Sequence, residues 1–219
     1  MMELARTGVA EGLWLRAESQ TGGKGRRGRR WVSPPGNLYA STVVRLQPTD
    51  PPPPSLALVA AVALHETVAA YAPALPLMLK WPNDLLSGQT KLAGILLERE
   101  GNAVIVGIGV NLAHHPDDVD RPATSLAASS TGAPDPETFL TDLAEVFQRW
   151  LQRWRDEGMA LVQARWRDHA HPVGTALSAR LGDDVIEGLF DGLDDVGALR
   201  LRLAGGEVRV IPAGDVFLL

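Results

Sequence analysis

The residues with the clearest capacity for chemistry form a glycine-rich, strongly basic segment from Gln20 to Trp31. Glycine lets backbone N–H groups approach an anion closely, and arginine gives charge-assisted, bidentate hydrogen bonds to phosphate. Five of the seven residues from Lys24 to Arg30 are basic, whereas the whole chain carries a net charge of −5. We therefore expect an anion such as a phosphate group to bind this segment. The alternatives are a solvated basic turn and a tether for nucleic acid.

Two familiar nucleotide motifs are excluded at this segment. The spacing Gly23-x-Gly25-x-x-Gly28 satisfies the dinucleotide-binding fingerprint, but that motif has to open a helix, and Ser33-Pro34-Pro35-Gly36 follows instead. A Walker phosphate loop is excluded because no Gly-Lys-Ser/Thr ending occurs. Because five like charges repel one another until an anion joins them, we expect residues 22–30 to be mobile without a ligand.

Three further segments have polar residues or glycines within or next to predicted strands. Pro82 fixes a turn after a short strand, so Asn83 and Asp84 project where oxygen ligands could hold a metal ion or a hydroxyl group. Lys91 heads an apolar strand and points its charge into the same cleft, unless it only reaches solvent. Glycine alternates in the strand Val106–Asn111, which indicates a closely approaching backbone, a flat ligand or a bulge.

Helices and strands with distinct sequence patterns separate these segments. β-branched and other apolar residues predict strands at 12–18, 38–46, 77–80, 92–98 and 103–111. Apolar residues at three- and four-residue steps predict a helix at 137–157, a second follows at 159–170, and a helix apolar on all sides is expected at 55–71. Five prolines within residues 48–54 indicate an exposed connection.

The chain changes character after His171-Pro172. Short apolar strands then alternate with Gly-Asp, Leu-Asp-Asp and Gly-Gly turns, which predicts a small β-barrel. With 219 residues, 45% of them hydrophobic, the chain can form one full core and a small module. We predict two domains, residues 1–171 and 172–219, and an α+β fold.

Taken together, the four segments resemble biotin–protein ligases. In that family the basic loop runs Gly-Arg-Gly-Arg-x-Gly-Arg-x-Trp, and residues 23–31 here match it except at Lys24. The family's Lys-Trp-Pro-Asn-Asp stands at 80–84, its Lys-Leu-(Ala/Gly)-Gly-Ile at 91–95 and its Gly-x-Gly-x-Asn at 107–111. Order and spacing match across residues 12–112, and the terminal β-domain also resembles that of the family.

The resemblance implies an ATP-dependent ligase with a mixed-sheet catalytic core and a C-terminal SH3-like β-barrel. Such enzymes use ATP and Mg²⁺ to form biotinyl-5′-AMP, then transfer biotin to a lysine of biotin carboxyl carrier protein. Joining a carboxylate to the α-phosphate of ATP brings anions together, so cations have to neutralise the reactants and the transition state. Lys91, Arg26 and Arg29 can supply this charge.

The resemblance also assigns roles residue by residue. The implied catalytic residues are Lys91, Arg26 and Arg29. The implied biotin-binding residues are Gln20, Gly23, Lys24, Gly25, Arg26, Lys91 and Gly94, and the glycine positions admit the flat bicyclic ligand. The implied ATP-binding residues are Arg26, Arg27, Gly28, Arg29, Trp31, Asn83, Asp84 and Asn111, of which Asp84 and Asn111 would hold Mg²⁺.

Besides Lys24, the sequence departs from the family at two further places. Family members carry a Ser-Thr pair, which binds the ureido oxygen of biotin, one helix before the glutamine, and here the chain begins at Met1 inside that helix. We therefore expect the natural coding frame to begin upstream of Met1 and this form to bind biotin weakly. Residues 123–126 read Ala-Thr-Ser-Leu where the family has an aromatic neighbour for adenine.

Two rival functions remain as alternatives. A lipoate or octanoyl transferase would share the core fold and the acyl-lysine chemistry, but the complete basic loop disfavours it. A DNA-binding regulator would need an extra N-terminal helix-turn-helix, and only 19 residues precede Gln20, so we expect no DNA partner.

The composition of the chain indicates its cellular location and excludes some classes of partner. The absence of cysteine excludes a thiolate nucleophile and fits a cytoplasmic location. The longest apolar run, residues 56–64, is too short for a membrane span, so we expect no membrane partner. An exposed sheet edge near Val110 would allow a homodimer or strand addition by the carrier protein.

Overall fold

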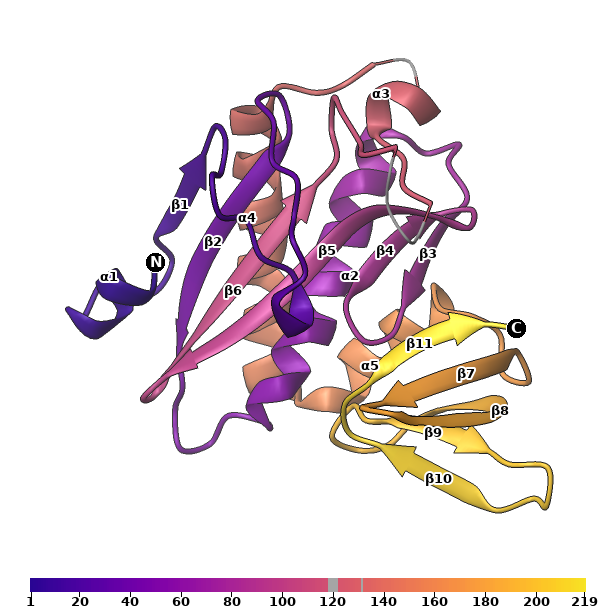
Figure 1. The fold of residues 1–219 in the computed structure, drawn as a ribbon. Coiled ribbons are helices and arrows are strands. Elements are labelled where there is room, and N and C mark those ends of the chain that lie inside the picture. The colour runs from indigo at the N-terminus through magenta and orange to yellow at the C-terminus, as the bar shows by residue number, and fades with distance from the viewer. Residues whose placement is uncertain (118–121, 131) are drawn as a thin grey trace.

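A six-stranded antiparallel sheet forms the centre of the larger domain, as seen in a computed structural model that describes residues 1–117, 122–130 and 132–219 (Figure 1). The strands lie in the order β1-β2-β6-β5-β4-β3. Their bounds are β1 Trp14–Ala17, β2 Leu38–Arg45, β3 Leu77–Lys80, β4 Asp84–Ser87, β5 Thr90–Glu100 and β6 Ala103–Val110. The α+β fold class expected from the sequence is confirmed.

Two details of the expected sheet are wrong. We expected a mixed sheet, but each described strand pairing is antiparallel, because hairpins join the consecutive strands from β3 to β6. Parallel pairing is limited to isolated bridges such as Leu79 with Ala170. Val110 does not lie at an edge, because β6 runs between β2 and β5, and the edge strands are β1 and β3.

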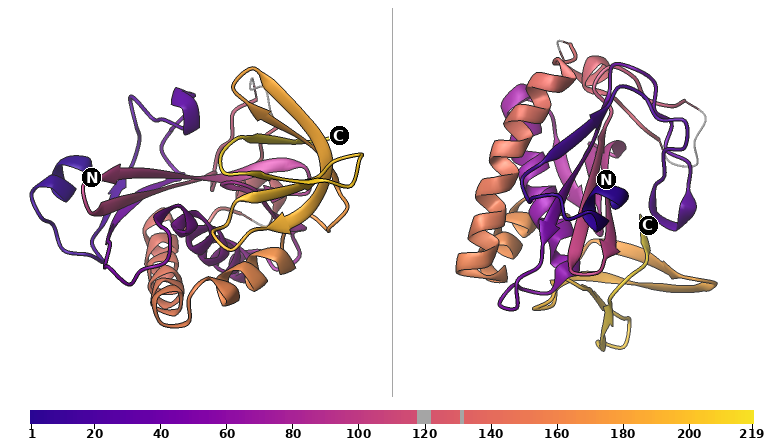
Figure 2. Two further views of the ribbon diagram at one scale, coloured as in Figure 1. Left: turned by 90° about the horizontal axis from the view of Figure 1, so that it is seen from below. Right: turned by 90° about the vertical axis from the view of Figure 1, so that its left-hand side faces the viewer.

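Helices cover one face of this sheet and leave the other to the basic loop (Figure 2). The long helices are α2 Leu56–Tyr71, α4 Pro136–Glu157 and α5 Met159–Asp168, close to the predicted bounds. Leu143, Phe147 and Leu151 of α4 are buried in the core, as their spacing predicts. Shorter turns of helix are α1 Met2–Arg6, η1 Arg26–Gly28, η2 Pro53–Ser55 and α3 Leu126–Ser129.

Helix α2 and the turn before it form a longer apolar segment than the run of residues 56–64 suggested. The segment Pro53–Tyr71 is long and apolar enough to cross a membrane, with a mean hydropathy of 1.3, but 67% of it is buried inside the protein. This burial is typical of a core helix. The helix lacks a polar face because the sheet covers one side and α4 the other.

The C-terminal part forms a second, five-stranded antiparallel sheet in the order β10-β9-β8-β7-β11. Its strands are β7 Ala176–Leu181, β8 Asp184–Leu193, β9 Leu199–Arg202, β10 Val208–Ile211 and β11 Asp215–Leu218. The turn before β9 contacts the larger domain, where Trp81 Nε1 donates to the Gly197 carbonyl at 3.1 Å. The 171/172 boundary and the SH3-like closure of the barrel stay predictions.

Candidate active site

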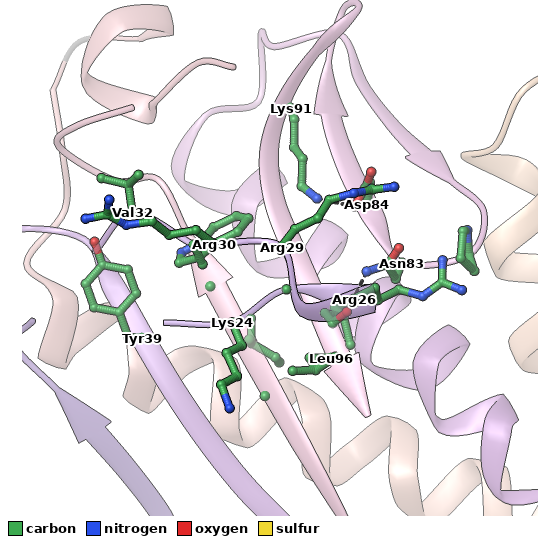
Figure 3. A pocket seen from close by; sticks show the side chains of 18 of the residues that line it. Lys24, Arg26, Arg29, Arg30, Val32, Tyr39, Asn83, Asp84, Lys91 and Leu96 are labelled. Atoms are coloured by element: carbon green, nitrogen blue, oxygen red, sulfur yellow. Dashed lines mark hydrogen bonds and ion pairs between the residues drawn. The ribbon is translucent and has the colours of Figure 1, made fainter. Parts of the chain in front are cut away.

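A cavity of about 960 Å³ lies over the helix-free face of the large sheet, between the basic loop and the C-terminal sheet (Figure 3). The four segments singled out in the sequence meet in its walls, although as many as 91 positions separate them along the chain. The predicted site residues that line it are Gln20, Lys24, Gly25, Arg26, Arg29, Trp31, Asn83, Asp84, Lys91, Gly94 and Asn111.

Three predicted site residues do not line this cavity. Gly23 is buried beneath the loop, where a Cβ atom would lie 2.5 Å from the carbonyl oxygen of Trp31 and 2.7 Å from Ser33 Oγ. Position 23 therefore requires glycine, because another part of the loop backbone passes close to it. Arg27 and Gly28 are exposed at the loop tip, and both have positive φ, 56° and 71°. Ligand contacts by these three residues stay predictions.

A floor of three glycines, Gly94, Gly107 and Gly109, lines the cavity where β5 and β6 pair. The indole of Trp31 lies on this floor, because a Cβ at Gly109 would come 2.9 Å from Trp31 Nε1 and one at Gly94 would come 3.3 Å from Trp31 Cζ3. We expected a flat bicyclic ligand there, and in this structure an indole occupies part of that surface. Trp31 Nε1 is buried and has no hydrogen-bond partner within residues 1–117, 122–130 and 132–219.

Lys91 reaches the cavity because of a β-bulge. Gly94, Leu96 and Glu98 of β5 line the cavity, and strict alternation would turn Lys91 to the opposite face, with Ala93 in the core. The pairing of β4 with β5 shifts between Leu85 and Leu86, which leaves Leu92 as an extra buried residue. The bulge therefore returns Lys91 to the side of the glycine floor.

Lys91 is held from two sides. Its Nζ lies 2.5 Å from Asp84 Oδ1 and 5.3 Å from the centre of the Trp31 ring (Figure 3). Its backbone is fixed by the next segment, since its N–H donates to the Pro122 carbonyl at 2.8 Å and its carbonyl accepts from Thr124 N at 3.0 Å. The ammonium group thus has a defined position at the cavity wall.

The two amides predicted to bind ATP also hold the structure together. Asn83 Nδ2 donates to the Ile95 carbonyl at 2.6 Å, which ties the turn after β3 to β5. Asn111 is buried and donates from Nδ2 to the Thr124 carbonyl at 3.0 Å. Gln20 Oε1, at the loop entrance, accepts from Ser33 Oγ at 2.9 Å. These contacts set the orientation of three polar side chains that face the cavity.

Arginines of the basic loop converge on a carboxylate of the C-terminal sheet. Arg29 Nη2 donates to Asp215 Oδ2, and Arg26 Nη1 donates to the Gly214 carbonyl at 2.9 Å. Burial lowers the pKa of Arg26 from its ordinary value, and the charges of Asp215 and Asp84 oppose this change. In Figure 3, Arg26 and Arg29 extend toward one side of the loop and Lys24 extends away from them.

None of the site residues predicted from the sequence lies in the C-terminal domain, although four residues of that domain line the cavity. Arg180 lies on β7, and Asp215, Val216 and Phe217 lie on β11. The acidic residues between positions 183 and 195 of this domain do not line the cavity. The only local signal for Asp215 is the Pro-Ala-Gly turn before it, which is too common to predict a site. Tyr39 and Ser41 of β2 were also overlooked, although alternation places them beside the glycine floor.

Comparison with known proteins identifies the family. The biotin/lipoate A/B protein ligase family matches residues 7–113, and the biotin protein ligase C terminal domain matches residues 178–219. The biotin–[acetyl-CoA-carboxylase] ligase of Paracoccus denitrificans is 42% identical over 96% of this chain and 92% of its own length.

Solved structures agree with this match. The biotin protein ligase of Aquifex aeolicus in complex with biotin and ATP superposes with a TM-score of 0.89 at 25% identity, over 99% of this chain and 94% of the other. The ligase of Leishmania major in complex with biotinyl-5-AMP gives a TM-score of 0.67 at 27% identity, over 97% and 94% of the two chains. With both domains matched and the site motifs gathered in one cavity, the chain belongs to the biotin–protein ligase family.

Proposed function

We propose that this chain is an ATP-dependent biotin–protein ligase that acts in two steps. In the first, a carboxylate oxygen of biotin attacks the α-phosphorus of ATP, which gives biotinyl-5′-AMP and releases pyrophosphate. In the second, the ε-amine of a carrier-protein lysine attacks the acyl carbon, which forms an amide and releases AMP and a proton. Three relatives support this reaction. One is named a biotin–[acetyl-CoA-carboxylase] ligase, and the structures of the other two are complexes with biotin and ATP and with biotinyl-5-AMP.

One observation carries the proposal, namely that Lys91, Arg26 and Arg29 surround a single cavity with a glycine floor. A site that joins two anions needs cations at both reacting groups, and donors aimed at developing charge contribute most to such catalysis. The glycine floor suits a flat ring system because three positions have no side chain, and the flat indole of Trp31 lies on part of it in this structure. A basic turn that only binds nucleic acid would not need this enclosed floor.

The geometry supports a division of roles within the cavity. Lys91, which Asp84 orients, is the group that meets the biotin carboxylate. Arg26 and Arg29 neutralise the phosphates, and Gln20, Gly25 and Lys24 lie at the entrance where the loop covers biotin. Trp31, Asn83 and Asn111 form the wall assigned to the nucleotide. No residue of the chain needs to become covalently modified, because each step transfers the acyl group directly.

The residues present fit a magnesium ion that arrives with the nucleotide. Among the described residues no three carboxylate or histidine side chains form a metal-binding cluster, and the ligands that we propose from the cavity lining are Asp84 and the amide oxygen of Asn111. Mg²⁺ commonly binds one or two carboxylates while it keeps waters and substrate phosphates. Bound there, it would neutralise phosphate charge.

The partner of the second step is proposed to be a biotin carboxyl carrier protein, because the relatives are named for acetyl-CoA carboxylase. The edge strand β1 is open to strand addition by that carrier or by a second copy of the chain in a homodimer. A cytoplasmic location is proposed from the absence of cysteine, and no role for DNA or a membrane is included.

The experiment that tests this function is incorporation of labelled biotin into a purified biotin carboxyl carrier domain. We expect incorporation that needs both ATP and Mg²⁺ and that stops when the acceptor lysine is replaced by arginine. Incorporation of octanoate or lipoate in place of biotin would overturn the proposal in favour of the related transferases. Release of pyrophosphate with biotin and ATP alone would isolate the first step.

A further inference from the structure

A single carboxylate of the C-terminal domain lies among three arginines of the basic loop. Asp215 Oδ2 accepts from Arg29 Nη2 and lies 3.5 Å from Arg27 Nη1, and Asp215 Oδ1 lies 3.7 Å from Arg26 Nη1. The partners are separated by 186 to 189 positions in the sequence. Two backbone carbonyls extend the contact, because Gly214 accepts from Arg26 at 2.9 Å and Arg180 from Arg27 at 3.5 Å.

Because the Asp215 carboxylate is buried, its ion pairs should influence the loop more strongly than surface ion pairs do. The side chain of Asp215 is 4% exposed, whereas those of Arg26, Arg27 and Arg29 are 24%, 41% and 50% exposed. A buried carboxylate stays charged only with strong partners, and removing its charge leaves arginines that repel one another. Asp215 is therefore an internal counter-ion for the arginines of the basic loop.

The loop conformation needs such an anchor. Arg27 has φ 56°, a left-handed conformation that is unfavourable for a residue other than glycine. Glycines at 22, 23, 25 and 28 add backbone entropy that opposes any single loop structure. Few backbone contacts hold the loop, among them Gly25 N to the Arg29 carbonyl at 2.7 Å and Trp31 N to the Gly23 carbonyl at 2.9 Å.

We propose that Asp215 is a positioning residue for ATP: it holds Arg26 and Arg29 at the cavity mouth before the nucleotide arrives. It acts through the arginines and touches no reacting atom. The C-terminal sheet is then part of the nucleotide site, because β11 carries the anchor and β7 supplies the Arg180 carbonyl. This role rests on the proposed ligase function, but the loop contact can be tested without it.

The test is the variant Asp215→Asn, which keeps the size of the side chain and removes its charge. In the absence of ligands, trypsin should cut this variant after the basic residues of the segment 24–30. The cleavage should be on the order of tenfold faster than in the native chain, because a charge-assisted contact is lost. The KM for ATP in the biotin-dependent release of pyrophosphate should rise by about the same factor, and kcat should change by less than about threefold. Asp215→Glu, which restores the charge, should recover most of the protection and of the KM.

A matched control comes from the same domain. Asp191 also pairs with two arginines, 3.0 Å from Arg200 and 3.5 Å from Arg202, and does not line the cavity. Asp191→Asn should leave loop cleavage and the KM for ATP unchanged. Mapping the tryptic fragments by mass spectrometry separates loop release from domain unfolding, because an unfolded C-terminal domain would also be cut after Arg200 and Arg202.

Three outcomes would overturn the role of Asp215. The first is unchanged loop cleavage in Asp215→Asn, and the second is faster cleavage at the loop and at Arg200 and Arg202 alike. The third is a lower KM for ATP, which would mean that Asp215 competes with phosphate for the arginines. Failure of the native chain to transfer biotin would overturn the proposed function instead and would leave the proteolysis result standing.

Discussion

Lys91 depends on one extra residue in β5 for its place in the cavity. The bulge at Leu92 turns the lysine to the side of the glycine floor, and Asp84 then fixes the ammonium group at 2.5 Å. A lysine on the other face would lie in the core, where burial of an unpaired charge is unfavourable. The position of this bulge is therefore as important to the site as the lysine itself.

Replacing Lys91 by alanine should slow adenylate formation by about 10²-fold or more, because the loss of one transition-state donor has an effect of this size. The fold should persist, since the side chain of Lys91 is 23% exposed and stands near the start of its strand. Single-turnover release of pyrophosphate measures the effect. Arg99→Ala on the same strand, which does not line the cavity, is the control, and a Lys91 variant as fast as this control would contradict the role.

Gly109 should tolerate alanine less well than Gly107 does. A Cβ at Gly109 would lie 2.9 Å from the Trp31 ring, whereas one at Gly107 would meet Leu96 O at 3.5 Å and Ser41 Oγ at 3.6 Å, which are ordinary contacts. Overpacking of this kind lowers the free energy of unfolding by about 1 to 3 kcal/mol. Urea denaturation should show this loss for Gly109→Ala and a smaller loss for Gly107→Ala.

The double variant Gly109→Ala with Trp31→Ala checks the cause. If the indole produces the crowding, alanine at 109 should lower the free energy of unfolding less when Trp31 is already absent. Equal losses in the two backgrounds would mean that the indole does not lie on Gly109 in solution.

Eleven of the fourteen site residues predicted from the sequence line the cavity, but their mutual arrangement was not predicted. Lys91, Asp84 and the arginines were found because their types and local spacing carry a chemical meaning. Asp215 was not found, because its meaning depends on Arg29, which lies 186 positions away. The bulge at Leu92 was overlooked because a strand pattern shows alternation, whereas a bulge appears only as two consecutive apolar residues.

Among the elements, the helices were the most predictable. Helix α4 carries its apolar residues at three- and four-residue steps over 22 residues, which is a long periodic signal. Strands β4 and β11 were not predicted, because each has only four residues and follows a turn that contains proline or glycine. The expected mixed sheet came from the resemblance, and the hairpins between β3 and β6 make it antiparallel.

A buried polar contact joins α4 to the residue just before α2, and a single substitution can remove it. Trp154 Nε1 of α4 donates at 2.8 Å to Oγ of Ser55, the residue before α2, and both side chains are buried. Ser55→Ala leaves the indole N–H without an acceptor, which lowers the free energy of unfolding by about 1 to 3 kcal/mol. Thermal or urea unfolding measures this loss.

The activity of the Ser55→Ala variant should stay near the native value at a temperature where it is folded, because Ser55 does not line the cavity. Thr141→Ala on the exposed side of α4 is the matched control, since its hydroxyl donates to the Glu137 carbonyl of its own helix. A loss as small as that of the control would show that water replaces the serine as acceptor for Trp154.

For the molecule as a whole, acid should reduce stability through His65, a buried histidine that stacks on a partly exposed one. His65 of α2 stacks on His169 after α5, with ring centres 3.8 Å apart. Burial first, then the charges of His169 and Arg165, lowers the pKa of His65 from 6.5 to about 4, and Glu66 opposes this shift. The unfolded chain therefore binds a proton at His65 at a higher pH than the folded protein does.

Stability should consequently fall as the pH decreases through 6.5 and should stop falling from this source near pH 4. Through His65 alone, the free energy of unfolding should be about 2 kcal/mol lower at pH 5 than at pH 7.5, because one pKa unit corresponds to about 1.4 kcal/mol. Urea unfolding at the two pH values should show a smaller pH-dependent loss in His65→Gln than in the native chain. Thr141→Ala, which removes no titratable group, should keep the native pH dependence; equal behaviour of the two variants would contradict the assignment.

The cavity walls come from parts of the sequence that lie far apart, and folding has to bring these parts together. The C-terminal sheet pairs strands within residues 176–218, and hairpins join the strands from β3 to β6, so both can form from local contacts. The contact of Arg29 with Asp215 closes a loop of 186 positions and forms only after both sheets exist. During refolding from urea, circular dichroism should therefore recover before ligase activity does, and the catalytic centre is the last part of the molecule to mature.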